Sequence, residues 1–337
     1  MNKPVCCIAA AALLLLAIIP VHARVSAEGA SLSGAECVVE VSSRRVLHAE
    51  NAERRLPMAS TTKILTAIII IEDCDLTETI EIPAEAAGTE GSSIHLRAGE
   101  RYTIEELLYG LMLRSGNDAA VALALHHSGS IRAFAQEMTE RAVFYGATDS
   151  TFANPHGLPA EDHRTTARDL ALIAAHAMEN DTFRTIVSTK YYSPRNWTNK
   201  NKMLAQYEGA AGIKTGFTTE AGRCLVTGAE REGMTVVSVV LNCPSMYERS
   251  AALLDHAFES YSLTQLCSQD ETVDGCKIRY HFSYPLTDRE QEQVERRLTF
   301  IEPRPETAGE IAGQMQILLE NRLLFSQNLY IMEQTNE

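Results

Sequence analysis

A serine and a lysine stand three residues apart at the start of a long apolar stretch, in the segment MASTTKILTAIIII. On a helix this spacing places Ser60 and Lys63 on one face, so the lysine amine can reach the serine hydroxyl. Serine becomes a strong nucleophile when an adjacent base takes its proton, and a buried, neutral lysine can be that base. A plain helix N-cap would by itself explain the serine. We expect Ser60 to do both: to begin the helix as its cap and to be the nucleophile, with Lys63 as its base.

Two further polar motifs follow in order along the chain. Residues 115–117 read S-G-N, and residues 214–216 read K-T-G. S-x-N alone is a weak signal, because a second copy occurs at residues 326–328, out of order, and we interpret that copy as chance. K-T-G is rarer. Together with S-x-x-K, the ordered set is typical of penicillin-binding proteins and class A β-lactamases.

The elements expected around these motifs indicate an α+β fold, with an antiparallel sheet flanked by helices and interrupted by a helical insertion. Strands come from both ends of the domain, and a long helix is buried behind the sheet. K-T-G is expected on an edge strand, at the start of the first strand of a late hairpin. The expected elements are strands at 36–41 and 44–51, a buried helix at 60–73, mostly helices over 103–178, a hairpin turning at 231–233 and a helix at 246–261.

Changes in composition divide the chain into three parts. Residues 1–27 have the layout of a secretory signal peptide, with an apolar run followed by small residues and cleavage expected after Ala27. A retained membrane helix is the alternative, but the apolar run is short for a comfortable span. Residues 28–265 hold all three motifs and are the predicted catalytic domain, and residues 270–337 are predicted to form a small β-rich domain.

Charge and ligand-type residues exclude several classes of function. The net charge is −14, which argues against nucleic acid as a partner. Two of the eight cysteines, Cys6 and Cys7, lie in the predicted signal peptide, and the other six show no paired C-x-x-C spacing. His156 and His163 lack a third clear ligand and lie in a Pro- and Gly-rich segment that predicts a structured loop. We expect no metal and no cofactor, and the pairing of the cysteines stays open.

With these motifs in place, the chain resembles the low-molecular-mass penicillin-binding proteins that act as serine-type D-alanyl-D-alanine carboxypeptidases. The resemblance spans nearly all of the chain beyond the signal segment. It is carried by RRLPMASTTKILTA, LMLRSGNDAAVALA, FANPHGLPAEDHRTTARDLALIA and GIKTGFTTEAGRCLVTGAEREGM. It implies the corresponding transpeptidase-like fold and a reaction that removes the terminal D-alanine from peptidoglycan stem pentapeptides.

The resemblance also implies catalytic roles for five side chains. Ser60 would attack the carbonyl between the two terminal D-alanines, and Lys63 would accept its proton. Ser115 and Lys214 would relay a proton to the leaving amine, with Lys214 also supplying positive charge. Asn117 would hold the peptide and keep Lys63 in place. The acyl-enzyme would then be hydrolysed.

Substrate contacts follow from the same resemblance. Thr215 would hydrogen-bond the terminal carboxylate, with Arg249 as a possible extra partner. The backbone N–H groups of Ser60 and Phe217 would form the oxyanion hole, and Gly216 would let the substrate backbone approach the strand. Some relatives carry histidine where this chain has Phe217, which places the contacts of that side chain in question.

Three other functions are compared with this one. A class A β-lactamase needs a glutamate in an E-x-x-L-N pattern between the second and third motifs, and no glutamate there fits, so fast β-lactam hydrolysis is disfavoured whereas weak turnover is not. A D,D-endopeptidase would use the same residues and stays the nearest alternative. A catalytically silent wall-associated protein would be expected to lack some of the catalytic residues.

The expected partners are peptides ending in D-Ala-D-Ala, with β-lactams as inhibitors. The signal-peptide layout of residues 1–27 predicts an exported protein, at the outer face of the cytoplasmic membrane, in the periplasm or in the cell wall. The last twenty residues contain one basic residue, Arg322, whereas an amphipathic membrane anchor normally pairs its apolar face with several. The sequence therefore predicts at most loose association with the membrane or wall.

Overall fold

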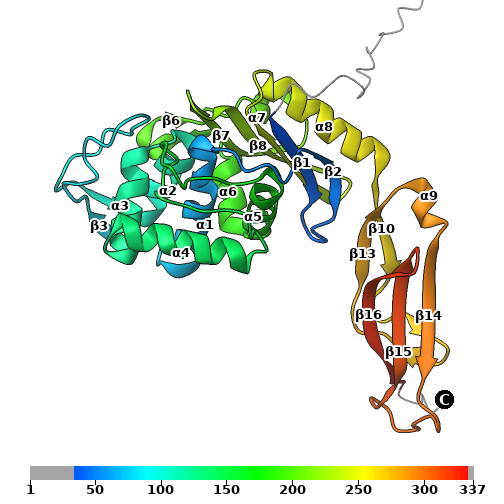
Figure 1. Ribbon diagram of the computed structural model, residues 1–337. Coiled ribbons are helices and arrows are strands. Elements are labelled where there is room, and N and C mark those ends of the chain that lie inside the picture. The colour runs from blue at the N-terminus through cyan, green and yellow to red at the C-terminus, as the bar shows by residue number, and fades with distance from the viewer. Residues whose placement is uncertain (1–33, 333–337) are drawn as a thin grey trace, which may run out of the picture. The chain divides into compact units, whose positions relative to one another are not determined.

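The computed structural model describes residues 34–332, and the predicted signal peptide lies outside them. A five-stranded antiparallel sheet with the order β2-β1-β9-β8-β7 forms the centre of the motif-bearing part (Figure 1). Its strands are β1 (Ala35–Glu40), β2 (Val46–Glu50), β7 (Ala210–Thr218), β8 (Gly222–Arg231) and β9 (Met234–Leu241). Because β1 pairs with β9, strands from both ends of this part meet in one sheet, and the predicted α+β class is confirmed.

The K-T-G motif lies on a strand of its own, which corrects one detail of the prediction. The hairpin is formed by β8 and β9 and turns at Glu232 and Gly233, both with positive φ. β7 precedes this hairpin as a separate edge strand and pairs antiparallel with β8. The chain reverses between them within a few residues, where Gly222 has a φ of 66° and Thr218 Oγ1 accepts a hydrogen bond from the N–H of Ala221. Because this turn is so short, the sequence pattern does not distinguish two strands, β7 and β8, from one continuous strand.

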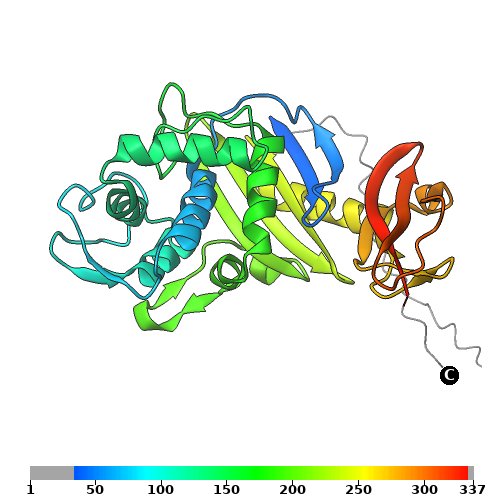
Figure 2. The ribbon, with the colours of Figure 1, turned by 90° about the horizontal axis from the view of Figure 1, so that it is seen from below.

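Helices cover both faces of the sheet. Those of this part are α1 (Lys63–Asp73), α2 (Ile104–Leu113), α3 (Asn117–Ser128), α4 (Ile131–Phe144), α5 (Ala167–Glu179), α6 (Asp181–Ser188), α7 (Met203–Gln206) and α8 (Met246–Ser260). α8 packs against one face of the sheet, and α5 and α6 pack against strands from the other side (Figures 1 and 2). Short pairs of strands, β3 (Thr79–Glu81) with β4 (Arg101–Thr103) and β5 (Tyr191–Tyr192) with β6 (Trp197–Thr198), complete this part.

α1 is the buried helix that the sequence predicts. A 3-10 turn, η1 (Ala59–Thr62), leads into it, and every residue from Lys63 to Ile70 is buried. Helices α2, α3, α4, α5 and α6 all contact α1. Each fully buried isoleucine or leucine stabilises the fold by roughly 1.5–3 kcal/mol, so the apolar run fixes α1 at the centre of the core.

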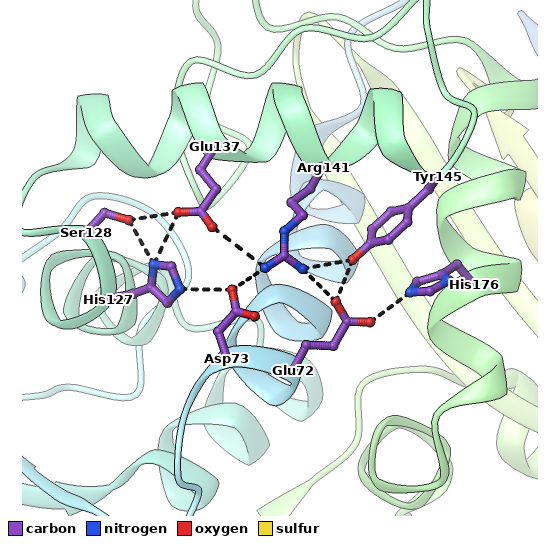
Figure 3. Close-up of polar contacts among 8 residues, drawn as sticks. All are labelled: Glu72, Asp73, His127, Ser128, Glu137, Arg141, Tyr145 and His176. Carbon is purple, nitrogen blue, oxygen red and sulfur yellow. Dashed lines mark hydrogen bonds and ion pairs between the residues drawn. The ribbon is translucent and has the colours of Figure 1, made fainter.

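Charged residues gather where α1 ends, in what we call the α1 C-terminal cluster (Figure 3). Its members are Glu72, Asp73, His127, Ser128, Glu137, Arg141, Tyr145 and His176. Arg141 on α4 donates to Glu72 at 2.8 Å and also pairs with Asp73, while His127 Nε2 lies 3.2 Å from Asp73 Oδ2. The cluster thus joins the last residues of α1 to the last turn of α3. The N-terminal ends of these two helices carry the first two motifs.

The C-terminal part is β-rich, as predicted. Its strands are β10 (Ser262–Cys267), β11 (Thr272–Val273), β12 (Cys276–Lys277), β13 (Phe282–Leu286), β14 (Val294–Phe300), β15 (Ile311–Leu319) and β16 (Arg322–Ile331), with the short helix α9 (Asp288–Gln291). β10 pairs antiparallel with β13 in a sheet of two strands. The other strands form a sheet with the order β11-β12-β16-β15-β14. The second S-x-N copy, at residues 326–328, lies within β16 and does not line the cavity that the three motifs share.

Across residues 34–332, no helix has both the length and the apolar character needed to span a bilayer.

The six cysteines in the described residues are all free thiols. Cys37, Cys224 and Cys243 are buried within the sheet and its two apolar layers, which is the usual environment of a structural cysteine.

Candidate active site

The three motifs meet at one cavity of about 280 Å³. It is lined by Ser60, Ser92, Ser115, Lys200, Thr215, Gly216, Phe217, Arg223, Met246 and Tyr247. Ser60 comes from η1, Ser115 from the loop between α2 and α3, and Thr215 from the edge strand β7. Residues that are distant in sequence therefore share one site, as the ordered motifs predict.

The turn that carries Ser60 is held in a strained conformation. Ala59 has a φ of 49°, which is unfavourable for a residue with a Cβ and must be enforced by its surroundings. Its carbonyl accepts a hydrogen bond from Thr62 Oγ1 at 2.8 Å. Gly157, with a φ of 93°, lies so close that a Cβ there would be 1.9 Å from the same carbonyl oxygen. Ser60 lies inside this turn and makes no capping bond, so the plain N-cap interpretation is wrong.

Lys63 meets the requirements for a general base. Its Nζ lies 3.1 Å from Ser60 Oγ, 2.7 Å from Asn117 Oδ1 and 2.6 Å from the carbonyl oxygen of His156, and the residue is 0% exposed. Burial, followed by the charges of Lys214 and Lys200, holds the pKa of Lys63 well below its usual value. A neutral amine has two N–H groups, and these donate hydrogen bonds to Asn117 Oδ1 and to the carbonyl oxygen of His156. The lone pair of the amine is then left to face the Ser60 hydroxyl.

The loop behind Ser60 supplies backbone groups and two neutral histidines. Burial lowers the pKa of His156 to about 3 and that of His163 to about 4, with the charge of Lys63 as the next cause for both. His163 Nδ1 accepts from the N–H of Ala153 at 3.1 Å, so its Nε2–H donates to Thr62 Oγ1 at 2.7 Å. Both nitrogens of this ring have protein partners, which confirms the structured loop.

The second motif connects Lys63 with the segment between β3 and β4. Ser115 has a φ of 65° and lines the cavity, and Asn117 begins α3. Asn117 accepts from Lys63 through Oδ1 and donates through Nδ2 to the carbonyl of Glu90. The amide is therefore oriented by two partners, and its oxygen faces the lysine.

The third motif lies against the turn of Ser60. A Cβ on Gly216 would be 3.1 Å from the backbone nitrogen of Ser60, so only glycine leaves this approach unstrained. Lys214 is buried, donates to the carbonyl of Thr215 at 2.8 Å, and has its pKa lowered to about 7 by burial and by Lys200. The side chain of Phe217 is 64% exposed at the rim of the cavity.

Arg249 is predicted as a site residue, but it does not line the cavity and makes no contact with the residues of the three motifs among the hydrogen bonds and ion pairs found in residues 34–332. Lys63, Asn117 and Lys214 do not line the cavity either, but hydrogen bonds connect Lys63 and Asn117 with Ser60, and Lys214 with Thr215. It lies in the first turn of α8, and its guanidinium pairs with both carboxylate oxygens of Glu36 on β1. Met246 and Tyr247 of the same turn do line the cavity. The physical reason is the buried carboxylate of Glu36, which is 0% exposed and attracts the nearby cation.

Sequence reasoning missed five of the lining residues: Ser92, Lys200, Arg223, Met246 and Tyr247. A signal existed for Arg223, because it faces Phe217 across the β7–β8 pair, and the pairing of these two strands fixes that register. Lys200 lies in a segment without regular structure between β6 and α7, and no spacing in the sequence connects it with the motifs.

The chain is similar to known D-alanyl-D-alanine carboxypeptidases. The family model of the D-alanyl-D-alanine carboxypeptidases, Peptidase S11, matches residues 22–245. The chain is 34% identical over 257 residues to the D-alanyl-D-alanine carboxypeptidase DacF of Bacillus subtilis, covering 72% of this chain and 66% of that protein. It is 36% identical over 229 residues to a D-alanyl-D-alanine carboxypeptidase of Streptomyces sp. strain K15, covering 61% of this chain and 79% of that protein.

Solved structures extend the likeness to the fold. Penicillin-binding protein 5 of Haemophilus influenzae superposes with a TM-score of 0.76 at 24% identity, over 90% of this chain and 98% of that one. The DD-transpeptidase of Streptomyces K15 superposes with a TM-score of 0.65 at 31% identity, over 68% of this chain and 98% of that one. From the family model and these relatives, the chain belongs to the Peptidase S11 family of D-alanyl-D-alanine carboxypeptidases.

Proposed function

We propose that Ser60 is the nucleophile of a serine-type D-Ala-D-Ala carboxypeptidase that removes the terminal D-alanine from peptidoglycan stem pentapeptides. The observation that carries this assignment is the position of the Lys63 amine, 3.1 Å from Ser60 Oγ with two carbonyl acceptors behind it. Family membership supports the reaction class.

The proposed reaction has two halves. In the first, the Ser60 oxygen bonds to the penultimate D-alanine carbonyl while its proton passes to Lys63, and the peptide C–N bond breaks. The leaving amine takes a proton by way of Ser115 and Lys214. In the second half, water attacks the acyl-enzyme, and Ser60 regains a proton as the shortened peptide leaves.

Charge that develops on the carbonyl oxygen needs fixed donors. We assign this role to the backbone N–H groups of Ser60 and Phe217, which belong to two segments that Gly216 allows to lie close together. Thr215 lines the same cavity, and its hydroxyl is the proposed partner of the terminal carboxylate. The strained φ of Ala59 is part of this assignment, because it helps orient the N–H of Ser60.

The lining of the cavity favours a peptidase over a fast β-lactamase. A class A β-lactamase uses a carboxylate to activate the water that removes the acyl group. None of the residues that line this cavity in the described structure is acidic. A penicilloyl group on Ser60 should therefore be long-lived, so β-lactams are proposed inhibitors. Attack by an amine in place of water would give a transpeptidase reaction, the activity for which the K15 DD-transpeptidase is named.

The cellular setting of the enzyme is also a proposal. Peptidoglycan lies outside the cytoplasm, so residues 1–27 are proposed to direct export, with at most loose association with the membrane or wall.

We propose a catalytic domain from residue 28 to Tyr261 and a separate β-rich domain from Ser262, because β10 pairs with β13. This differs from the boundary near 265–270 that composition indicates.

A matched pair of serine variants tests the proposal. Ser115 and Ser326 both begin an S-x-N motif, but Ser326 lies on β16, outside the cavity. D-alanine release from a pentapeptide should fall by about 100-fold or more in Ser115→Ala, as is typical for loss of proton-transfer catalysis, and stay unchanged in Ser326→Ala. Equal activity in the two variants would remove the second motif from the mechanism.

A further inference from the structure

We propose that Arg223 is the cation that binds the terminal carboxylate of the substrate, beside the hydroxyl of Thr215. This specificity role rests on the proposed function, and it replaces the role that the sequence suggests for Arg249. The ligand class is a peptide with a free C-terminal α-carboxylate.

The register of the sheet places Arg223 at the mouth of the cavity. Arg223 on β8 pairs with Phe217 on β7, and side chains two residues apart on a strand point to the same face, so Thr215 and Phe217 share one side. The guanidinium carbon lies 5.8 Å from the centre of the Phe217 ring. Ser60, Thr215 and Arg223 all line the same cavity. A peptide whose scissile carbonyl reaches Ser60 would thus carry its terminal carboxylate toward these two strands.

Arg249 is already committed elsewhere. Its Nε donates to Glu36 Oε2 at 2.9 Å, and its Nη2 pairs with Glu36 Oε1. Turning toward the substrate would withdraw a two-pronged partner from a carboxylate that is 0% exposed, and breaking a buried pair is costly. Arg223, by contrast, makes no ion pair with any residue in the range 34–332, so its charge is available to a ligand.

The other basic side chains in or near the cavity have different proposed roles. Lys63 and Lys214 are buried and have lowered pKa values, and the pKa of Lys200 is also lowered by burial and by Arg114. Arginine keeps its charge at every working pH, and its planar fork matches the two oxygens of a carboxylate. Arg223 thus supplies a permanent positive charge where the lysines are tuned for proton transfer.

The test compares two peptides that differ only at the C-terminus. One ends in D-Ala-D-Ala with a free carboxylate, and the other ends in the corresponding C-terminal amide. The wild-type enzyme should favour the free acid in kcat/KM. Arg223→Gln should lower kcat/KM for the acid by about 10- to 100-fold, the usual effect of losing a charge-assisted hydrogen bond, and change that for the amide little. Arg223→Lys should keep part of the preference.

Two companion variants exclude simpler explanations. Arg231→Gln removes a positive charge from the other end of β8, where Arg231 pairs with Asp255, and should keep the acid preference. Arg249→Gln tests the rival residue. The inference is overturned if Arg223→Gln retains the wild-type acid-to-amide ratio, or if Arg249→Gln loses that ratio while Arg223→Gln does not. If Arg223→Gln fails to fold, the ratio of Arg223→Lys decides: an undiminished preference refutes the two-pronged contact.

These outcomes are distinct from failure of the proposed function. A wild-type enzyme that releases no D-alanine from either peptide, and takes up no penicillin, would contradict the carboxypeptidase assignment itself. A wild-type enzyme that is active, with the same acid preference in Arg223→Gln, would contradict only the carboxylate role of Arg223.

Discussion

Three lysines set the protonation of the active site. In the proposed mechanism, Lys63 is required as a neutral base and Lys214 as a charged donor. Burial lowers the pKa of both, and the positive charge of Lys200 lowers each further. As the pH increases, kcat/KM should rise when Lys63 loses its proton and becomes a base. It should fall again when Lys214 loses its proton, at a pH near the Lys214 pKa of about 7. The expected pH profile of kcat/KM is therefore bell-shaped.

Removal of the Lys200 charge should move this profile. In Lys200→Gln the pKa values of Lys63 and Lys214 both rise, since a neighbouring positive charge that disfavoured their protonation is gone. Both limbs of kcat/KM against pH should therefore shift to higher pH. Lys202→Gln is the matched control, because Lys202 lies over the ring of Tyr247 and is not one of the charges that lower the pKa of Lys63 or Lys214. Limbs that stay in place in Lys200→Gln would show that Lys200 does not tune the pair.

At the scale of elements, the 3-10 turn η1 is held from behind by the loop of His163. The chain of contacts runs from the His163 imidazole to Thr62 Oγ1 and on to the carbonyl of Ala59, next to the nucleophile. Thr62 is buried, with 0% exposure, so both partners depend on its hydroxyl.

Replacement of this hydroxyl should slow acylation. Thr62→Val keeps the shape of the side chain but leaves the His163 N–H and the Ala59 carbonyl without a partner, and buried unsatisfied groups cost about 1–3 kcal/mol. Acylation by benzylpenicillin should fall by about 10-fold or more at a temperature where the variant stays folded. Thr62→Ser restores the hydroxyl and should restore the rate. A slow Thr62→Ser variant would point to loss of the methyl group, not of the hydrogen bond.

The sequence predicts most elements of this fold, because their patterns are local. The apolar run of α1, the paired β-branched runs of β8 and β9, and the helical insertion all follow from periodicity. The motif residues on η1, α3 and β7 follow instead from three short motifs and their order along the chain. The pairing of Arg249 with Glu36 joins residues 213 positions apart, and no local pattern shows it. Likewise, β10 looks like part of the preceding domain until its pairing with β13 is seen.

For the whole molecule, the solved K15 structure indicates how much of the chain is needed. It superposes over 98% of its own length but only 68% of this chain. A protein ending after Tyr261 should therefore fold and keep the acylation rate of the full chain. A protein ending after Cys267 keeps β10 without its partner β13, and an unpaired strand promotes association. Light scattering should detect oligomers of the longer fragment, and a monomeric longer fragment or an inactive shorter one would contradict this boundary.

Intact mass measurement shows whether Ser60 forms an acyl-enzyme with a β-lactam. The protein is exposed briefly to benzylpenicillin, with and without a peptide ending in D-Ala-D-Ala. One penicilloyl group per chain is predicted on the wild-type enzyme, with less when the peptide competes and none on Ser60→Ala. An equal adduct on Ser60→Ala, or an unmodified wild-type enzyme with the penicillin left intact, would contradict the role of Ser60 as the nucleophile.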